Sequence, residues 1–140
     1  MKSICIDTGV LTNYFSKDKT EAVKALMDGI MNQKTQAHVL KPTLTEVFYH
    51  ICKDGGIQEA NTLILNFMRN FPIDFVDLDE SLILFSGKLK CQHPSTLSYI
   101  DCMSIAFCLK NGVEFHTTEK LLKQIPHNVL GRLRTVKYEW

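Results

Sequence analysis

Four acidic residues, Asp7, Glu46, Asp101 and Glu119, stand where a metal-binding site could form. Each follows a short apolar run or opens a helical pattern, although more than a hundred positions separate the first from the last. In an open α/β fold such positions gather at one edge of the sheet, where ligands bind. Two carboxylates about 4 Å apart repel each other by about 4 kcal/mol at an effective dielectric constant of about 20, so the cluster needs a cation. Hard oxygen ligands favour Mg²⁺ or Mn²⁺, which indicates a metal-dependent phosphodiesterase.

Each of these acids also fits an ordinary structural role at the start of a helix. Asp7 could cap the helix that follows the first strand. Thr43 and Glu46 fit a capping box, and Ser98 and Asp101 fit a weaker version of it. The fourth acid would suit the first turn of a helix through the helix dipole. The two kinds of role are compatible, so the informative feature is that all four acids share one topological position.

The elements that must position these acids alternate along the chain. Short apolar or alternating runs predict strands at residues 3–6, 38–41, 73–78, 113–117 and 135–140. A helical stretch is expected directly after Asp7, and apolar residues at helical spacing predict further helices at residues 21–32, 43–53, 57–71, 80–90, 98–110 and 119–124. This alternation predicts one α/β domain over residues 1–140, with a mostly parallel sheet of about five strands.

Composition places the chain among ordinary globular domains, with 45% apolar residues, 22% charged residues and a net charge of +1. Because the chain is not strongly basic, contacts with phosphates should be local or mediated by a metal ion. Asp7 interrupts the first apolar run too early for a signal peptide, and no run approaches the roughly 20 apolar residues of a membrane span. Five cysteines at no recognisable spacing indicate free thiols in a reducing cytoplasm.

Other motifs that could carry chemistry are weak or missing. Asp7-Thr8-Gly9 is also the tripeptide of aspartic proteases, but those proteins have an all-β fold, unlike the α/β pattern predicted here. Because this chain carries one copy of the tripeptide, an aspartic protease could form only as a homodimer of the retroviral type. The chain has no glycine-rich phosphate-binding loop, no dinucleotide-binding fingerprint and no nucleophile elbow. Cys91 and His93 lack partners at the spacing of a zinc site.

The segments around the four acids resemble the motifs of PIN-domain nucleases, in particular the small VapC-like ribonucleases. The resemblance rests on Ile-Cys-Ile-Asp7-Thr8 followed by Leu11, on Thr45-Glu46 opening a helix, on Asp101 opening an apolar helix, and on Thr117-Thr118-Glu119 after a strand. The four motifs occur in the family's order, about 40, 55 and 18 residues apart, and span nearly the whole chain. The resemblance implies a three-layer α/β/α fold and Mg²⁺- or Mn²⁺-dependent hydrolysis of single-stranded RNA.

The resemblance also implies a role for each motif residue. Asp7 and Asp101 would hold the principal metal ion, Glu46 would bind it or orient the attacking water, and Glu119 would bind a second ion or act through water. Thr8 and Thr45 would orient the metal-binding carboxylates by hydrogen bonds, and Thr117 or Thr118 would do the same or touch a phosphate. Local backbone capping is the structural alternative for these threonines.

Two departures from the family pattern support a second interpretation. Family members usually have Asp where this chain has Glu119, and often have a second acid where it has Leu121. The alternative is therefore a non-catalytic PIN-like module that binds RNA or a protein partner. The VapC-like resemblance further implies an inhibitory antitoxin as partner and a homodimer. The amphipathic helices at residues 21–32 and 57–71 could supply an interface, or their apolar sides could face the core.

Overall fold

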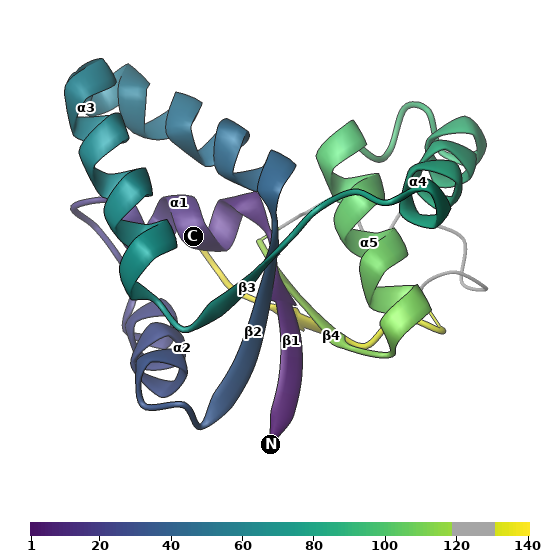
Figure 1. Ribbon diagram of the computed structural model, residues 1–140, viewed down its shortest axis with the longest axis horizontal. Coiled ribbons are helices and arrows are strands. Elements are labelled where there is room, and N and C mark those ends of the chain that lie inside the picture. Colours follow the sequence, from purple (N-terminus) through teal and green to yellow (C-terminus); the bar gives the residue numbers. More distant parts are fainter. Residues whose placement is uncertain (119–130) are drawn as a thin grey trace.

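The fold is described from a computed structural model, which covers residues 1–118 and 131–140. Its centre is one sheet of five strands in the order β3-β2-β1-β4-β5, and every neighbouring pair is parallel (Figure 1). The strands are β1 (Lys2–Ile6), β2 (Thr35–Leu40), β3 (Ile73–Val76), β4 (Glu114–Thr117) and β5 (Thr135–Lys137). The predicted parallel sheet of about five strands is therefore confirmed, with β1 at its centre and β5 at an edge.

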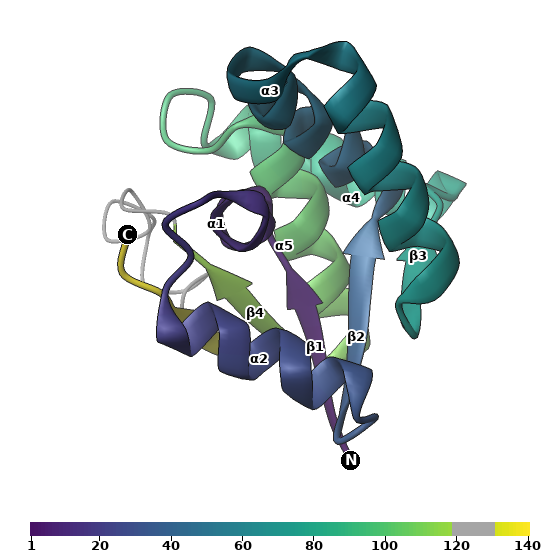
Figure 2. The same ribbon diagram turned by 90° about the vertical axis from the view of Figure 1, so that its left-hand side faces the viewer.

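Helices cover both faces of this sheet. They are α1 (Thr8–Phe15), α2 (Glu21–Met31), α3 (Lys41–Asn70), α4 (Glu80–Gln92) and α5 (Tyr99–Asn111). Helices α1, α2 and α3 lie on one face and α4 and α5 lie on the other, as Figures 1 and 2 show from two directions. This arrangement confirms the three-layer α/β/α fold. The helix predicted at residues 119–124 lies outside the residues that the structure describes.

Each helical layer closes a hydrophobic core of its own against the sheet. Because successive side chains of a strand point to opposite faces, Ile4 and Ile6 enter the core under α1, α2 and α3, whereas Cys5 enters the core under α4 and α5. The apolar sides of α2 and of the second half of α3 face the first core, through Val23, Met27, Ile30, Ala60, Ile64 and Phe67. The prediction that the apolar sides of these two helices face the core is therefore confirmed.

Helix α3 begins two residues earlier than the sequence pattern predicts. Its N-cap is Leu40, and Pro42 lies in its first turn, where a missing backbone N–H costs nothing and the fixed φ of proline favours the helix. The predicted capping box of Thr43 and Glu46 is wrong, because Thr43 is buried inside the helix instead of preceding it. The Glu46 carboxylate is consequently not used to cap this helix.

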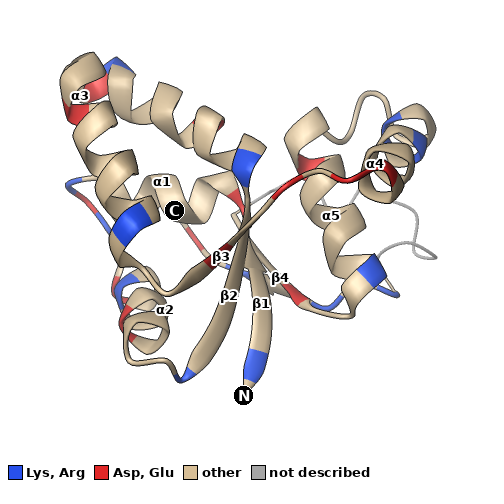
Figure 3. Ribbon diagram, in the orientation of Figure 1, with Lys and Arg blue, Asp and Glu red and all other residues tan. Residues whose placement is uncertain are grey.

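Three further features of the described residues concern membrane-spanning helices, charge and thiols. No helix within residues 1–118 and 131–140 is long and apolar enough to cross a bilayer. Over the same part of the chain, Lys and Arg positions are interspersed with Asp and Glu positions along the ribbon (Figure 3). All five cysteines are free thiols, as predicted, and three of them are buried.

A glycine sets the kink in α3 and supplies a first testable prediction. Gly56 has φ 88° and ψ 169°, a conformation that residues with a Cβ atom rarely adopt. We expect Gly56→Ala to lower the free energy of unfolding by about 1–3 kcal/mol, measured by urea denaturation. Gly55→Ala is the matched control, because Gly55 lacks a positive φ and its new Cβ would meet only the movable carboxylate of Glu59. An equal effect of both substitutions would contradict the explanation.

Candidate metal and catalytic site

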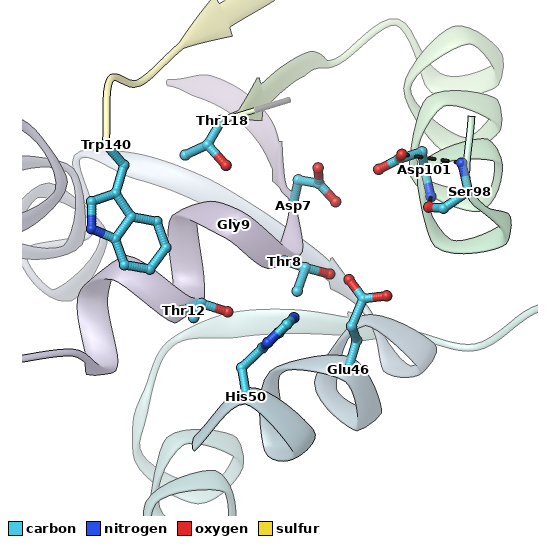
Figure 4. Close-up of a pocket in the computed structure, with 10 residues that line it drawn as sticks. All are labelled: Asp7, Thr8, Gly9, Thr12, Glu46, His50, Ser98, Asp101, Thr118 and Trp140. Carbon is cyan, nitrogen blue, oxygen red and sulfur yellow. Dashed lines mark hydrogen bonds between the residues drawn. The ribbon is translucent and has the colours of Figure 1, made fainter. Parts of the chain in front are cut away.

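A cavity of about 430 Å³ opens where β1 and β4 end, and three of the four predicted acids line it. Asp7 follows β1, Glu46 comes from α3 and Asp101 comes from α5, so the cavity draws on the sheet and on both helical layers. Figure 4 shows their carboxylates directed toward the shared space. The fourth acid, Glu119, lies outside the described residues. The cavity is lined by Asp7, Thr8, Gly9, Thr12, Glu46, His50, Ser98, Asp101, Thr118 and Trp140.

Asp7 is the most deeply buried of the three acids, with 4% of its surface exposed. Its Oδ2 accepts a hydrogen bond of 3.0 Å from the Thr117 hydroxyl. Its Oδ1 is buried and has no hydrogen-bond partner among the described residues. Although Asp7 occupies the N-cap position of α1, its side chain makes no capping hydrogen bond, so the predicted capping role is wrong. The carboxylate is instead available for a ligand in the cavity.

Burial and a neighbouring carboxylate perturb the titration of Asp7. Its pKa rises from 3.8 to about 7, first because burial disfavours the charged form and then because Asp101 and, more weakly, Glu46 repel the negative charge. The backbone amide of Thr8 and the hydroxyl of Thr117 act in the opposite sense. A buried carboxylate that is repelled by its neighbours gains most from a cation placed between them.

Asp101 combines a structural role with its place in the cavity. The Ser98 hydroxyl accepts a hydrogen bond of 3.0 Å from the Asp101 backbone N–H, and the Asp101 carboxylate accepts one of 3.2 Å from the Ser98 backbone N–H. The predicted capping box at the start of α5 is therefore confirmed. The capping box holds the carboxylate at the cavity with 8% of the residue exposed.

The four predicted threonines do not all reach the site. Thr8 and Thr118 line the cavity, and Thr117 lies behind it and donates to Asp7. Thr45 instead lines a separate, mainly apolar cavity between the two halves of α3, so the structure does not bring it to the acids. A Cβ atom at Gly9 would clash with the Thr118 hydroxyl oxygen, which shows how closely α1 approaches the end of β4.

Sequence reasoning missed three residues that line the cavity: Thr12, His50 and Trp140. His50 follows Glu46 by four residues on α3, a spacing that places both on one side of a helix and could have revealed it. Thr12 stands in the same relation to Thr8 on α1. No sequence pattern near Trp140 predicts that it lines the cavity, because its position depends on the pairing of β5 with β4.

The hydrogen bond from Thr117 to Asp7 supplies a second testable prediction. Thr117→Val removes the hydroxyl at nearly constant volume and leaves Asp7 Oδ2 buried without this donor. We expect the free energy of unfolding at pH 8 without metal to fall by about 1–3 kcal/mol, as measured by urea denaturation. Thr117→Ser keeps the hydroxyl and should retain most of the stability. A loss of stability in Thr117→Ser as large as in Thr117→Val would count against the hydrogen bond as the cause.

The residues of the cavity fit a divalent cation of the Mg²⁺ type. Among the described residues, no three His, Cys, Asp or Glu side chains form a ready-made metal site. Mg²⁺, however, is often bound by only one or two carboxylates and keeps several water molecules. Such a site needs an oxygen free to bind the ion and carboxylates that repel one another. Asp7 Oδ1, which has no hydrogen-bond partner within residues 1–118 and 131–140, and the repulsion between Asp7 and Asp101 meet these needs. Asp7 and Asp101 could hold the ion directly, and Glu46 through water.

Comparisons with known proteins agree with this architecture. The sequence matches the PIN domain family over residues 4–128, and no curated protein matches it. VapBC2 from Rickettsia felis, bound to a DNA fragment from its promoter, is similar over 98% of this chain and 99% of that chain, with a TM-score of 0.72 and 13% identity. DNA-bound VapBC from Salmonella typhimurium is similar over 98% of both chains (TM-score 0.70, 16% identity). VapC20 from Mycobacterium tuberculosis, a toxin that cleaves the sarcin–ricin loop, is similar over 79% of this chain and 85% of that chain (TM-score 0.67, 15% identity).

Proposed function

Because this chain belongs to the PIN domain family, we propose that it is a Mg²⁺- or Mn²⁺-dependent endoribonuclease that hydrolyses single-stranded RNA. The observation that carries the proposal is the convergence of Asp7, Glu46 and Asp101 on one cavity, where a buried oxygen of Asp7 has no partner among the described residues. Carboxylates this close together repel one another and destabilise the folded protein unless a cation lies between them. A divalent ion beside a phosphodiester is in turn suited to promote its hydrolysis.

The proposed chemistry assigns a role to each residue of the cavity. A bound divalent ion lowers the pKa of water and stabilises the negative charge of the leaving oxygen. Asp7 and Asp101 would hold the ion, and Thr117 would keep the Asp7 carboxylate oriented through its hydrogen bond. Glu46, which is half-buried at the edge of the cavity, would accept a hydrogen bond from the attacking water. Thr8 and Thr118 would donate to the carboxylates or to a phosphate, and Glu119 remains the proposed fourth acid.

We further propose that the protein acts as the toxin of a toxin–antitoxin pair. Several structures of similar fold are described as VapBC or toxin–antitoxin complexes. A ribonuclease of this kind would need an inhibitory protein partner in its own cell, and a homodimer is part of the same proposal. The five free thiols suit a reducing compartment such as the cytoplasm.

The proposal is tested by titrating the purified protein with Mg²⁺ and Mn²⁺ in the presence of labelled single-stranded RNA. We expect cleavage to require the metal ion and to stop when EDTA is added. RNA that is retained without being cleaved would favour the second candidate, a non-catalytic PIN-like module. The observation in favour of that candidate is the departure from the family pattern at Glu119 and Leu121.

Binding of the metal should also be visible in the stability of the folded protein. We expect Mn²⁺ or Mg²⁺ to raise the melting temperature of the parent protein, because a ligand that binds only the folded state stabilises it by about 2.7 kcal/mol at a hundred times its dissociation constant. Asp7→Asn should show a much smaller shift in differential scanning fluorimetry. Equal shifts in the two proteins would exclude Asp7 as a ligand.

A further inference from the structure

Trp140 is the only tryptophan of the chain, and it stands beside the acidic cavity with 53% of its surface exposed. It lines the acidic cavity and also two neighbouring ones, of about 180 and 650 Å³. Figure 4 shows its indole ring on the side of the cavity opposite to Asp101. An exposed aromatic ring at the junction of three cavities offers a flat apolar surface directly beside the proposed reaction site.

The backbone that carries Trp140 is held in place by its neighbour Tyr138. The Tyr138 backbone N–H donates to the Thr117 carbonyl at 2.8 Å, and the Tyr138 hydroxyl lies 2.7 Å from Nδ1 of His116. His116 is buried in β4, and its Nε2 lies 3.0 Å from the Glu114 carboxylate. These contacts fix Tyr138, two residues before the indole, beside Thr117, the residue that donates to Asp7.

The larger neighbouring cavity continues the acidic one past the indole. The two cavities share Thr12, His50 and Trp140 in their walls. Together they form a groove that leads from the acids along the indole toward the turn after α1. A nucleotide next to a phosphate held at the acids would therefore enter the larger cavity.

The charges of the larger cavity favour a base over a phosphate. Its wall carries one lysine, Lys17, but three carboxylates, Asp18, Asp54 and Glu59. A phosphate would be repelled by this excess of negative charge, whereas the N–H groups of a nucleobase could donate to the carboxylates. Stacking on an aromatic side chain is the common way in which proteins hold bases of single-stranded nucleic acids.

We propose that Trp140 is a stacking platform for one nucleobase of the RNA strand, next to the phosphate that a divalent ion would bind at Asp7 and Asp101. This inference rests on the proposed function and adds to it a binding subsite for a base. Because every base has an aromatic face, the subsite should bind any of the four bases but should bind an abasic nucleotide more weakly.

The fluorescence of the single tryptophan gives a direct test in the parent protein. A short single-stranded RNA is mixed with the protein in the presence of Mg²⁺, the emission is read at early times before cleavage, and the result is compared with that for a fully abasic strand of the same length. We expect the base-containing RNA to quench the Trp140 emission and the fully abasic strand to leave it nearly unchanged. Equal quenching by both strands, or no binding of RNA at all, would overturn the proposal.

Substitutions test the same subsite without relying on fluorescence of the indole. Trp140→Leu should weaken binding of dye-labelled RNA, measured by anisotropy, about tenfold or more, and Trp140→Phe should retain most of the affinity. In the cleavage assay the loss should appear in KM, with kcat nearly unchanged. Leu84→Ala is the control, since Leu84 is 74% exposed on α4 and lines none of the three cavities.

The outcomes separate this inference from the proposed function. Metal-dependent cleavage with an unchanged KM in Trp140→Leu would overturn the stacking platform and leave the ribonuclease proposal intact. Base-dependent quenching without cleavage at any metal concentration would support the platform and overturn the ribonuclease proposal. Base-dependent quenching together with a raised KM in Trp140→Leu would support both.

Discussion

Replacing Asp7 with Asn is expected to reduce metal-dependent cleavage of single-stranded RNA by more than about a hundredfold, with the fold retained. The loss should exceed the roughly 10- to 100-fold effect of removing an outer partner of a metal ligand, because the substitution removes the charge of the ligand itself. Asparagine has the shape of aspartate, and its amide oxygen can still accept the hydrogen bond from Thr117. Purified protein is assayed with labelled RNA at saturating Mn²⁺, and circular dichroism checks the fold.

Asp101→Asn is expected to give a loss of the same size for the same reason. The N-cap Ser98 is unchanged, and the amide oxygen of asparagine can still accept the hydrogen bond from the Ser98 backbone N–H, so the first turn of α5 should survive the substitution. Asp28→Asn serves as the matched control, because Asp28 is exposed on α2 and lines none of the cavities described above. Full cleavage by both Asp7→Asn and Asp101→Asn would show that the catalytic assignment is wrong.

The metal-free form of Asp7→Asn should be more stable than the parent protein at pH 8 and equally stable near pH 4. The pKa of Asp7 is raised from 3.8 to about 7 on folding, so between these values the folded parent holds a proton that the unfolded chain has released. The free energy of unfolding of the parent therefore falls as the pH rises through this window. The asparagine side chain of the variant does not titrate, and the difference between the two proteins should grow to at most about 4 kcal/mol, since one pKa unit corresponds to about 1.4 kcal/mol.

Urea denaturation of both proteins in EDTA at pH 4, 6 and 8 measures this difference. Groups that do not interact with Asp7 titrate alike in both proteins and cancel in the comparison. Adding Mn²⁺ at pH 8 should shrink or reverse the advantage of Asp7→Asn, because only the parent gains the full stabilisation from the metal ion. A difference in stability that stays constant across the pH range would contradict the burial and repulsion described for Asp7.

Much of the fold and the main acids of the site could be predicted because their signals are local. Asp7 could be identified because it directly follows a short buried strand. Asp101 could be identified because it lies in the capping box that opens an apolar helix. Alternation of such strands and helices was enough to predict the parallel sheet, and the resemblance to PIN-domain nucleases implied its two helical layers. The acid positions converge because the carboxyl ends of parallel strands share one edge of the sheet.

The remaining features depend on packing that no short segment reveals. Pro42 could equally end a strand or open a helix. In the structure it lies in the first turn of α3, so the helix starts earlier than predicted and Thr43 is not its N-cap. The packing of α3 decides which of its sides faces the cavity, so Glu46 reaches it and Thr45 does not. Trp140 reaches the site only because β5 pairs with β4 at the edge of the sheet.

The origin of the acids in separate parts of the fold has a mechanical consequence. Glu46 belongs to the layer built around one core and Asp101 to the layer built around the other, whereas Asp7 directly follows the central strand between them. A divalent ion held by these side chains would cross-link the two helical layers across the sheet. Amide hydrogen exchange in the first turns of α1 and α5 should then slow together when the ion binds, although the two helices lie in different cores.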